Sequence, residues 1–357
     1  MKIGIITHHY VKNYGAFLQM KALYETLRLL YPNAEIKIIN YVNKKHWYKN
    51  ILHVLHFRKG IDTIKSYTQK IRQLMIFSKY EHTIPRTKKV KTAKDILNLN
   101  FDIIVFGSDE IWNFGASGYS PIKFGYGLEG FKGKLIAYAP SAGFVNAKTE
   151  IPKEIYEGIK KFDYLSARDD TTLELIKKVC NINAKKMLDP TFLYNFDYDI
   201  EQNKIKNYKD KYILIYDCKL TQDMVKDLKE YAKKNNYKIF GAGDYKDFYD
   251  EIMINLTPYE WVNLFRNAEK VITGTFHGAV FSIKYYKNFI CFPTENNRIK
   301  KIESLLKDMN LEKQLLKLDE KENFKKMLTN SSDYSYAKKY IDNQIEKAKN
   351  YLNQKNN

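Results

Sequence analysis

The stretch that decides the fold is residues 271–283, which read VITGTFHGAVFSI. Apolar residues open it, small residues fill its middle and apolar residues close it, which indicates a buried strand, a turn and a helix. His277 lies at the turn, and it is the only one of the seven histidines beyond residue 82. Because open α/β sheets bind ligands at the carboxyl ends of strands, an imidazole here can serve an anionic ligand. The alternative is a histidine that merely begins a helix.

The same pattern of strand, turn and helix recurs along all 357 residues. At the N-terminus it gives a β-α-β unit, the signature of a parallel sheet. Strands are expected in the first half at 2–7, 35–40, 101–106, 134–138, 162–167 and 186–188, and in the second half at 211–216, 238–240, 270–273 and 289–292. We therefore predict an α/β fold of two Rossmann-like domains that face a cleft.

The expected domain boundaries follow from changes in composition. The first Rossmann-like domain is predicted at 1–197, with a helical insertion at about 44–95, where lysine, histidine and aromatic residues are frequent and no strand signal occurs. A polar, irregular linker precedes the second Rossmann-like domain at 211–310. A lysine-rich helical tail is expected at 311–357.

The formal net charge of +19 suggests an anionic partner. Only seven of the 60 basic residues are arginine, however, and the lysines are spread over the whole chain. Since arginine is the favoured reader of base edges, we expect no nucleic-acid partner. Dispersed lysine instead favours anionic small substrates and peripheral contact with an anionic membrane surface.

Cysteine usage and hydropathy bear on the compartment. The three cysteines lie far apart, at 180, 218 and 291, which argues against a zinc ribbon or a disulfide framework and suits a reducing compartment. No run of 18 apolar residues occurs that could span a membrane. We therefore expect a cytoplasmic protein, with the inner face of the cell membrane as the site of any peripheral contact.

Polar residues gather where predicted strands end. Asn13, Tyr14 and Gly15 follow the first strand and could hold a phosphate or carboxylate through backbone N–H groups, although an ordinary β-α turn is the favoured alternative. Asp109 and Trp112 follow the strand at 101–106. Asp109 could act as a base on a sugar hydroxyl and Trp112 could stack on a sugar face; an N-cap and a core tryptophan are equally good interpretations.

Two arginines also follow strands. Arg168 comes directly after the strand at 162–167, and its planar guanidinium suits a carboxylate or phosphate, the alternative being an ion pair with a nearby carboxylate. Arg298 lies in a loop of the second half and could reach the same cleft, although a solvated charge is the favoured alternative. The Asp189-Pro190 pair is a stiff exit from a strand, for which a conformational lock is the favoured interpretation.

Six segments in order resemble the polysaccharide pyruvyl transferase family. They are NYGAFLQ at 13–19, DIIVFGSDEIWN at 102–113, YAPSAG at 138–143, LSAR at 165–168, LDPT at 188–191 and TFHG at 275–278. The resemblance implies a GT-B-like fold. It also implies transfer of the pyruvyl unit of phosphoenolpyruvate to two hydroxyls of one sugar, in a surface polysaccharide or its lipid-linked precursor. The products would be a cyclic ketal and phosphate.

The resemblance also implies roles for individual residues. Arg168 and His277 match the arginine and histidine that hold phosphoenolpyruvate, and Asp109 matches an acidic residue of the family. From this resemblance we expect His277 and Asp109 to be the catalytic residues and Trp112 to contact the acceptor sugar. The other expected phosphoenolpyruvate contacts are Asn13, Tyr14, Gly15 and Arg298. No metal ion or cofactor is implied, because phosphoenolpyruvate is the donor substrate.

Two other functions remain open at this point. A nucleotide-sugar-dependent GT-B glycosyltransferase would release a nucleoside diphosphate instead of phosphate. A non-catalytic, glycan-binding member of the family would be stabilised by sugar but not by phosphoenolpyruvate. One departure also bears on donor binding, since some members carry an arginine two residues before the histidine, where this chain has Thr275.

Overall fold

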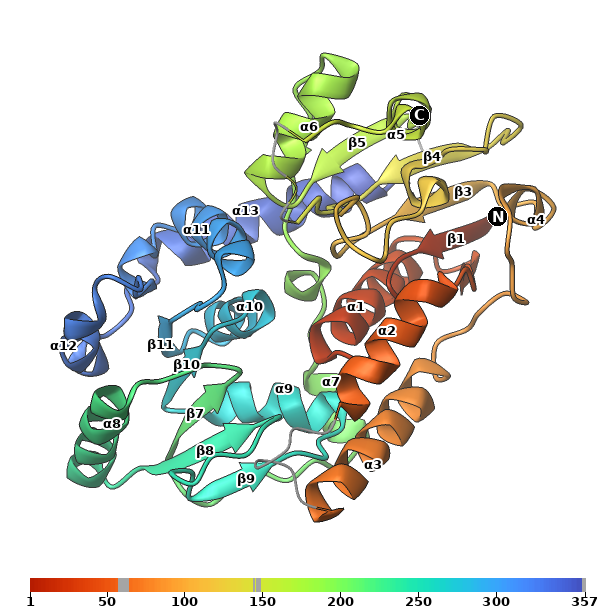
Figure 1. Ribbon diagram of the computed structural model, residues 1–357. Coiled ribbons are helices and arrows are strands. Elements are labelled where there is room, and N and C mark those ends of the chain that lie inside the picture. The colour runs from red at the N-terminus through yellow and green to blue at the C-terminus, as the bar shows by residue number, and fades with distance from the viewer. Residues whose placement is uncertain (57–63, 144, 146–148, 355–357) are drawn as a thin grey trace. The chain divides into compact units, whose positions relative to one another are not determined.

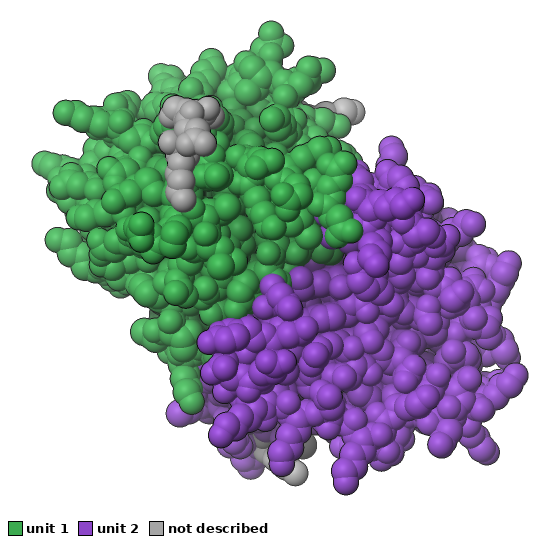
Figure 2. Space-filling model, turned by 180° about the vertical axis from the view of Figure 1, so that it is seen from behind, with its two compact units in different colours: residues 1–58, 77–194, 342–357 green, residues 59–76, 195–341 purple. Residues whose placement is uncertain are grey.

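The computed structural model of this chain describes residues 1–56, 64–143, 145 and 149–354. Contacts divide the chain into two units, which Figure 2 colours separately. Unit 1 comprises residues 1–58, 77–194 and 342–357, and unit 2 comprises residues 59–76 and 195–341. Each unit is built on its own parallel sheet.

The sheet of unit 1 has six strands in the order β2-β1-β3-β4-β5-β6 (Figure 1). Every neighbouring pair is parallel, so all six carboxyl ends lie at one edge. The strands are short, and most of their side chains are buried. They are β1 (Lys2–Ile6), β2 (Glu35–Ile38), β3 (Ile103–Phe106), β4 (Lys134–Ala137), β5 (Tyr164–Ala167) and β6 (Lys185–Lys186).

Helices connect these strands and cover the sheet. The first, α1 (Tyr14–Leu30), begins where the Asn13 side chain accepts a hydrogen bond from the backbone N–H of Ala16, a common N-cap. Apolar side chains of the strands and helices form the core, in which Trp112, Phe124 and Ile155 are fully buried. The other helical elements of unit 1 are α2 (Lys44–Leu55), α4 (Ala93–Leu97), η1 (Pro121–Phe124), α5 (Lys153–Ile159), α6 (Asp170–Cys180) and η2 (Pro190–Phe192). Helix α3 (Ile64–Glu81) is divided, since its residues up to 76 are grouped with unit 2.

Unit 2 repeats the same design on a five-stranded parallel sheet with the order β11-β10-β7-β8-β9. Its strands are β7 (Tyr212–Tyr216), β8 (Lys238–Ala242), β9 (Glu251–Met253), β10 (Lys270–Thr273) and β11 (Asn288–Cys291). Its helical elements are α7 (Asp197–Gln202), α8 (Gln222–Asn235), α9 (Pro258–Asn267), α10 (Phe276–Lys284), α11 (Asn296–Asp308), η3 (Glu312–Gln314), η4 (Lys321–Asn323) and α12 (Phe324–Thr329).

The last helix, α13 (Ser335–Leu352), belongs to both units, since its residues from 342 onward are grouped with unit 1. There the Tyr351 hydroxyl donates to the carbonyl of Ala137, and the Tyr31 hydroxyl donates to the carbonyl of Leu352 at 2.8 Å. The tail expected at 311–357 is thus divided between the units. Residues 59–76, expected inside the insertion of the first domain, are grouped with unit 2.

Hydropathy adds one observation about the helices. Among the residues that the structure describes, no helix combines the length and the apolar character needed to cross a bilayer.

Candidate functional site

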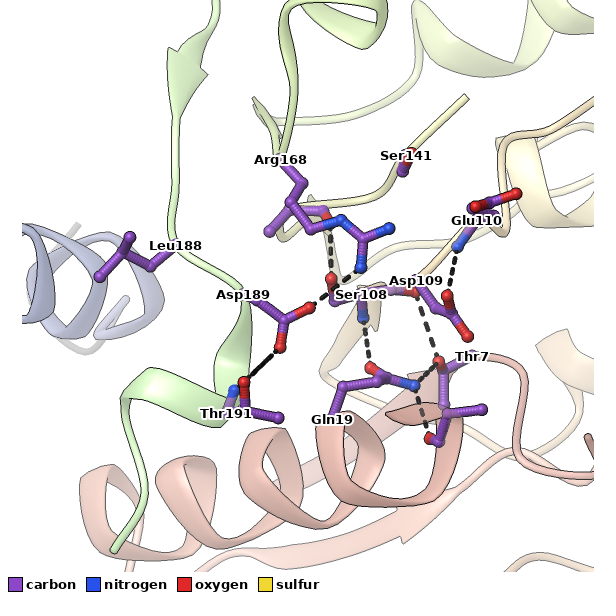
Figure 3. Close-up of polar contacts among 12 residues, drawn as sticks. Thr7, Gln19, Ser108, Asp109, Glu110, Ser141, Arg168, Leu188, Asp189 and Thr191 are labelled. Atoms are coloured by element: carbon purple, nitrogen blue, oxygen red, sulfur yellow. Dashed lines mark hydrogen bonds and ion pairs between the residues drawn. The ribbon is translucent and has the colours of Figure 1, made fainter. Parts of the chain in front are cut away.

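Polar side chains of unit 1 collect at the carboxyl edge of its sheet (Figure 3). Thr7 follows β1, Ser108 and Asp109 follow β3, Arg168 follows β5 and Asp189 comes soon after β6. Because the strands are parallel, chain segments far apart in sequence deliver these groups to one place.

Arg168 is held by a buried ion pair. One guanidinium nitrogen, Nη1, lies 2.9 Å from Oδ2 of Asp189, and the two side chains are 3% and 0% exposed. The other carboxylate oxygen of Asp189 accepts hydrogen bonds from the backbone N–H and the hydroxyl of Thr191, at 3.0 and 2.8 Å. Asp189 therefore has a fixed orientation and fixes that of Arg168 in turn.

The charge of Arg168 is stabilised despite burial. Burial disfavours the charged guanidinium, but the carboxylates of Asp189, Asp109 and Asp169 outweigh this effect and raise the pKa of Arg168 above its ordinary value. The negative charge of Asp109 thus acts on Arg168, although the two residues follow different strands. The edge holds a permanent cation beside a half-buried carboxylate.

Asp109 lies in a turn that only certain residues can form. Gly107, at the start of this turn, has φ +131°, and a Cβ there would lie 2.0 Å from the carbonyl oxygen of Tyr138. Asp109 itself has φ +70°, a left-handed conformation that aspartate tolerates better than most residues. Its carbonyl accepts the N–H of Ser141 at 2.8 Å, and its Oδ1 accepts the N–H of Glu110 at 2.9 Å.

Gln19, on helix α1, holds this turn in place through a hydrogen bond. Its side chain is completely buried on α1, where Oε1 accepts the backbone N–H of Ser108 at 3.1 Å. Its Nε2 donates to Oγ1 of Thr7 at 2.9 Å and to the carbonyl of Ala16 at 3.0 Å. One amide side chain therefore ties α1 to the ends of β1 and β3, as Figure 3 shows.

A buried lysine also interacts electrostatically with Asp109. The ammonium of Lys123 is fully buried, and it is 3.2 Å from Nδ1 of His8, 3.4 Å from the hydroxyl of Tyr10 and 3.3 Å from the carbonyl of Gly118. Three N–H donors therefore meet three acceptors. The Tyr10 hydroxyl can then donate to Nδ1 of His46, 3.2 Å away.

These contacts perturb the titration of the cluster. Burial lowers the pKa of Lys123 to about 7, and the negative charge of Asp109 opposes that effect. Burial, followed by the charge of Lys123, lowers the pKa of His46 to about 4 and that of His8 well below its ordinary value. Near neutral pH, neutral imidazoles therefore surround a lysine that can gain or lose its proton.

In unit 2, His277 and Arg298 lie beyond the carboxyl ends of strands β10 and β11. Thr275 caps α10 by accepting the N–H of Gly278 at 3.0 Å, which leaves half-buried His277 in the first turn of the helix. Arg298 pairs with Asp217 at 2.7 Å and with Glu295 at 3.1 Å. Asp217 follows β7, and Arg298 comes after β11. Strand β10, which leads to His277, lies between these two strands, so the ion pair joins the chain segments on either side of it.

Comparison with known proteins decides the family. The sequence profile described as Polysaccharide pyruvyl transferase matches residues 13–296. The chain belongs to the polysaccharide pyruvyl transferase family. A search of curated protein sequences found no match to this chain.

Solved structures show that this family member has a GT-B-like fold. The chain resembles UDP-GlcNAc 2-epimerase from Methanocaldococcus jannaschii with a TM-score of 0.51 and 14% identity, covering 98% of this chain and 100% of the other. UDP-GlcNAc 2-epimerase from Neisseria meningitidis, bound to UDP-GlcNAc, gives a TM-score of 0.50 and 10% identity, with 99% of each chain covered. At these identities the likeness concerns the fold, and the predicted α/β class with two parallel sheets is confirmed.

Some residues expected in the site have structural roles. Trp112 is 0% exposed; its ring stacks on Phe124 at 5.7 Å and its Nε1 donates to the carbonyl of Lys123 at 2.8 Å. Neither face is available to a sugar, so the structure places Trp112 in the core and not against an acceptor. Asn13 is exposed and caps α1, whereas Tyr14 is buried and its ring lies 5.0 Å from that of Phe77.

Lys123 and the role of Gln19 were missed by the sequence reasoning. Lys123 lies in a segment without periodicity, and its partner His8 is 115 positions away, so no local pattern could indicate a buried ammonium. Gln19 offered a weak signal, because a polar residue on the apolar face of a helix needs a partner inside the protein.

Proposed function

We propose that this protein transfers the pyruvyl unit of phosphoenolpyruvate to two hydroxyls of one sugar, forming a cyclic ketal and releasing phosphate. The sugar would belong to a surface polysaccharide or to its lipid-linked precursor. One observation carries the proposal within the family: a buried guanidinium, Arg168, is fixed by Asp189 at the same sheet edge as the Asp109 carboxylate. A fixed cation beside a base suits a reaction between an anionic donor and a hydroxyl.

In this proposal Arg168 binds the carboxylate or phosphate of phosphoenolpyruvate with its planar guanidinium. His277 binds the phosphate or delivers a proton to the methylene carbon, which creates an oxocarbenium-like centre at C2. Asp109 accepts the proton of the attacking hydroxyl as the first C–O bond forms. Attack of the second hydroxyl closes the ring as the C–O bond to phosphate breaks, and the proton of this hydroxyl leaves with the phosphate. General acid–base help of this kind contributes roughly 10²–10⁴-fold to the rate.

Some family members carry an arginine two residues before the histidine. In this chain, the N-terminus of α10 is our candidate to supply the positive charge of that arginine. Thr275 cannot supply it, but it caps α10, and the N-terminus of a helix carries a partial positive charge that favours a phosphate. Arg298, paired with two carboxylates, supports this proposal less than the helix N-terminus does. Binding at the N-terminus of α10 would place the phosphate next to His277.

The test measures phosphate release from phosphoenolpyruvate across a panel of lipid-linked and nucleotide-linked sugar acceptors. We expect His277→Ala to lose at least about two orders of magnitude in rate while keeping its melting temperature. His82→Ala is the matched control, because His82 is exposed and its ring contacts the carbonyl of Ser78, at the end of the neighbouring helix α3. Near-normal turnover by His277→Ala would remove His277 from the mechanism.

A thermal-shift series separates the proposed function from its two alternatives. Stabilisation by phosphoenolpyruvate is expected here. Stabilisation by UDP, with release of a nucleoside diphosphate, would indicate a nucleotide-sugar-dependent glycosyltransferase. Stabilisation by simple sugars alone, without phosphate release from any acceptor, would indicate a glycan-binding protein.

A further inference from the structure

Helix α2 is attached to unit 1 by its polar side chains. His46 contacts the Tyr10 hydroxyl at 3.2 Å, and Oδ1 of Asn50 accepts the backbone N–H of Lys12 at 2.9 Å. Asn43, which caps the helix, donates to the carbonyl of Tyr119 at 2.9 Å. None of the twelve residues of α2, all within the described part of the chain, is buried. This is the reverse of an ordinary surface helix, which packs its apolar side on the protein.

The apolar residues of α2 lie on one side of the helix. Trp47, Tyr48 and Leu52 are 43%, 59% and 49% exposed. Three further aliphatic residues are partly buried, at positions 51, 54 and 55. At about 100° per residue, these six positions fall within an arc of roughly 160°. An apolar face of this kind, with three large exposed side chains, is typical of an interaction site.

The charged residues of α2 itself are all positive. Lys44, Lys45 and Lys49 are exposed, and the helix sequence KKHWYKNILHVL contains no acidic residue. Lysine can lie along an apolar surface while its ammonium reaches outward to an anion. Tryptophan and tyrosine prefer the boundary between water and an apolar phase, because their rings are apolar and carry a polar group.

We propose that α2 (orange in Figure 1) docks on the surface of an anionic lipid bilayer. Trp47, Tyr48 and Leu52 enter the headgroup region, and the neighbouring lysines contact lipid phosphates. A basic helix with exposed aromatic and aliphatic side chains fits this surface better than it fits a protein, which would have to match both the wide apolar arc and the lysines. The proposal stands on α2 alone and does not depend on the proposed catalytic function.

The test uses vesicles of phosphatidylcholine alone and vesicles that also contain phosphatidylglycerol. We expect sedimentation with the anionic vesicles, weakened by salt, and little with the neutral ones. Tryptophan fluorescence gives a local readout: Trp112 and Trp261 are 0% exposed, so a blue shift on vesicle binding reports Trp47. The double variant Trp47→Ala, Leu52→Asp should keep its melting temperature, because both residues are exposed, and should lose about tenfold or more in vesicle affinity.

Matched controls distinguish binding through α2 from a general attraction of the positively charged protein to anionic vesicles. Leu29→Asp changes a leucine that is 75% exposed on α1 and should leave binding unchanged. Lys45→Glu with Lys49→Glu should weaken binding far more than Lys233→Glu with Lys234→Glu, an equal charge change at exposed positions of α8.

Three results would overturn the proposal: equal weakening by the two lysine pairs, absence of binding to anionic vesicles, or unchanged binding by the Trp47, Leu52 variant. If, without vesicle binding, the wild type were dimeric and that variant monomeric, the face would instead join two copies of the chain.

Discussion

At the scale of single residues, Asp189 shows how one carboxylate can serve both stability and function. Its Oδ2 pairs with Arg168 in a buried environment, and its Oδ1 is fixed by Thr191. Asp189→Asn would leave a buried guanidinium without its counter-charge, which costs about 3–5 kcal/mol. We expect that loss in urea unfolding, together with a fall of roughly 10²-fold in kcat/KM for phosphoenolpyruvate, because Arg168 loses its orientation.

The comparison for this prediction is Asp170→Asn. Asp170 pairs with Lys186 at a similar distance of 2.9 Å, but its side chain is 57% exposed. An exposed pair contributes at most about 1 kcal/mol, so this variant should unfold nearly as the wild type does. Equal losses for the two variants would mean that the buried pair has no special importance.

The titration of Lys123 allows a test of how a positive charge near Asp109 affects the reaction. Below its pKa of about 7 the lysine is charged and acts on Asp109; above that pH the charge is lost. We expect the rate of phosphate release to fall as the pH rises through about 7, because the sheet edge proposed to bind the anionic donor then loses a positive charge.

In Lys123→Met this transition should disappear and the rate should be low at every pH. The melting temperature should also fall, because methionine leaves the buried acceptors of His8, Tyr10 and Gly118 without their donor. A folded Met variant that kept the wild-type pH profile would exclude this role for Lys123.

At the scale of elements, the turn after β3 depends on a glycine. In Gly107→Ala the new Cβ would meet the Tyr138 carbonyl at 2.0 Å, and φ +131° is unfavourable for any side chain. We expect a loss of at least about 1–3 kcal/mol of stability and a larger loss of activity, because Asp109 follows two residues later. Gly115→Ala is the control, since its Cβ would have ordinary contacts at 3.6 and 3.7 Å. Comparable melting temperatures for the two variants would contradict the steric argument.

The strands that sequence reasoning could find are those with long apolar runs. Residues 103–106, which read IIVF, form such a run and became β3. Strand β9, at Glu251–Met253, was not predicted, because three residues carry no periodicity and the strand depends on pairing with β8. Helix α13 was expected as part of a tail, but no sequence pattern shows that a helix ends in the other unit.

At the scale of the whole molecule, the site could be predicted only in part. Arg168 and Asp109 carry sequence signals, because each directly follows a strand or its turn and matches a family segment. Trp112 shares that segment, yet it is buried, since proximity in sequence does not decide which side of a turn faces the core. The lysine at 123 and its histidines meet only through the tertiary fold, which composition and spacing do not encode.

Buried histidines also make the stability of the molecule depend on pH. Burial, and then the charge of Arg86, lowers the pKa of His9 to about 3, and burial lowers that of His46 to about 4. Unfolded histidines titrate near pH 6.5, so below that pH the unfolded chain binds protons that the folded chain does not. Stability must therefore fall as the pH decreases from about 6.5 toward 4. Lys123 does not contribute in this window, because its shift acts between about 7 and 10.5.

Urea unfolding at about pH 7 and pH 5 measures this effect. His9 alone should account for a difference on the order of 2 kcal/mol, given the size of its shift. In His9→Gln that part of the difference should vanish, whereas the exposed His82 can be replaced by glutamine with the full difference retained. A His9→Gln variant that loses as much stability on acidification as the wild type would show that His9 takes up its proton normally in the folded protein. The buried groups around Lys123, whose charge also acts on His9, would then be open to water, and the argument that Lys123 titrates near neutral pH would fail with them.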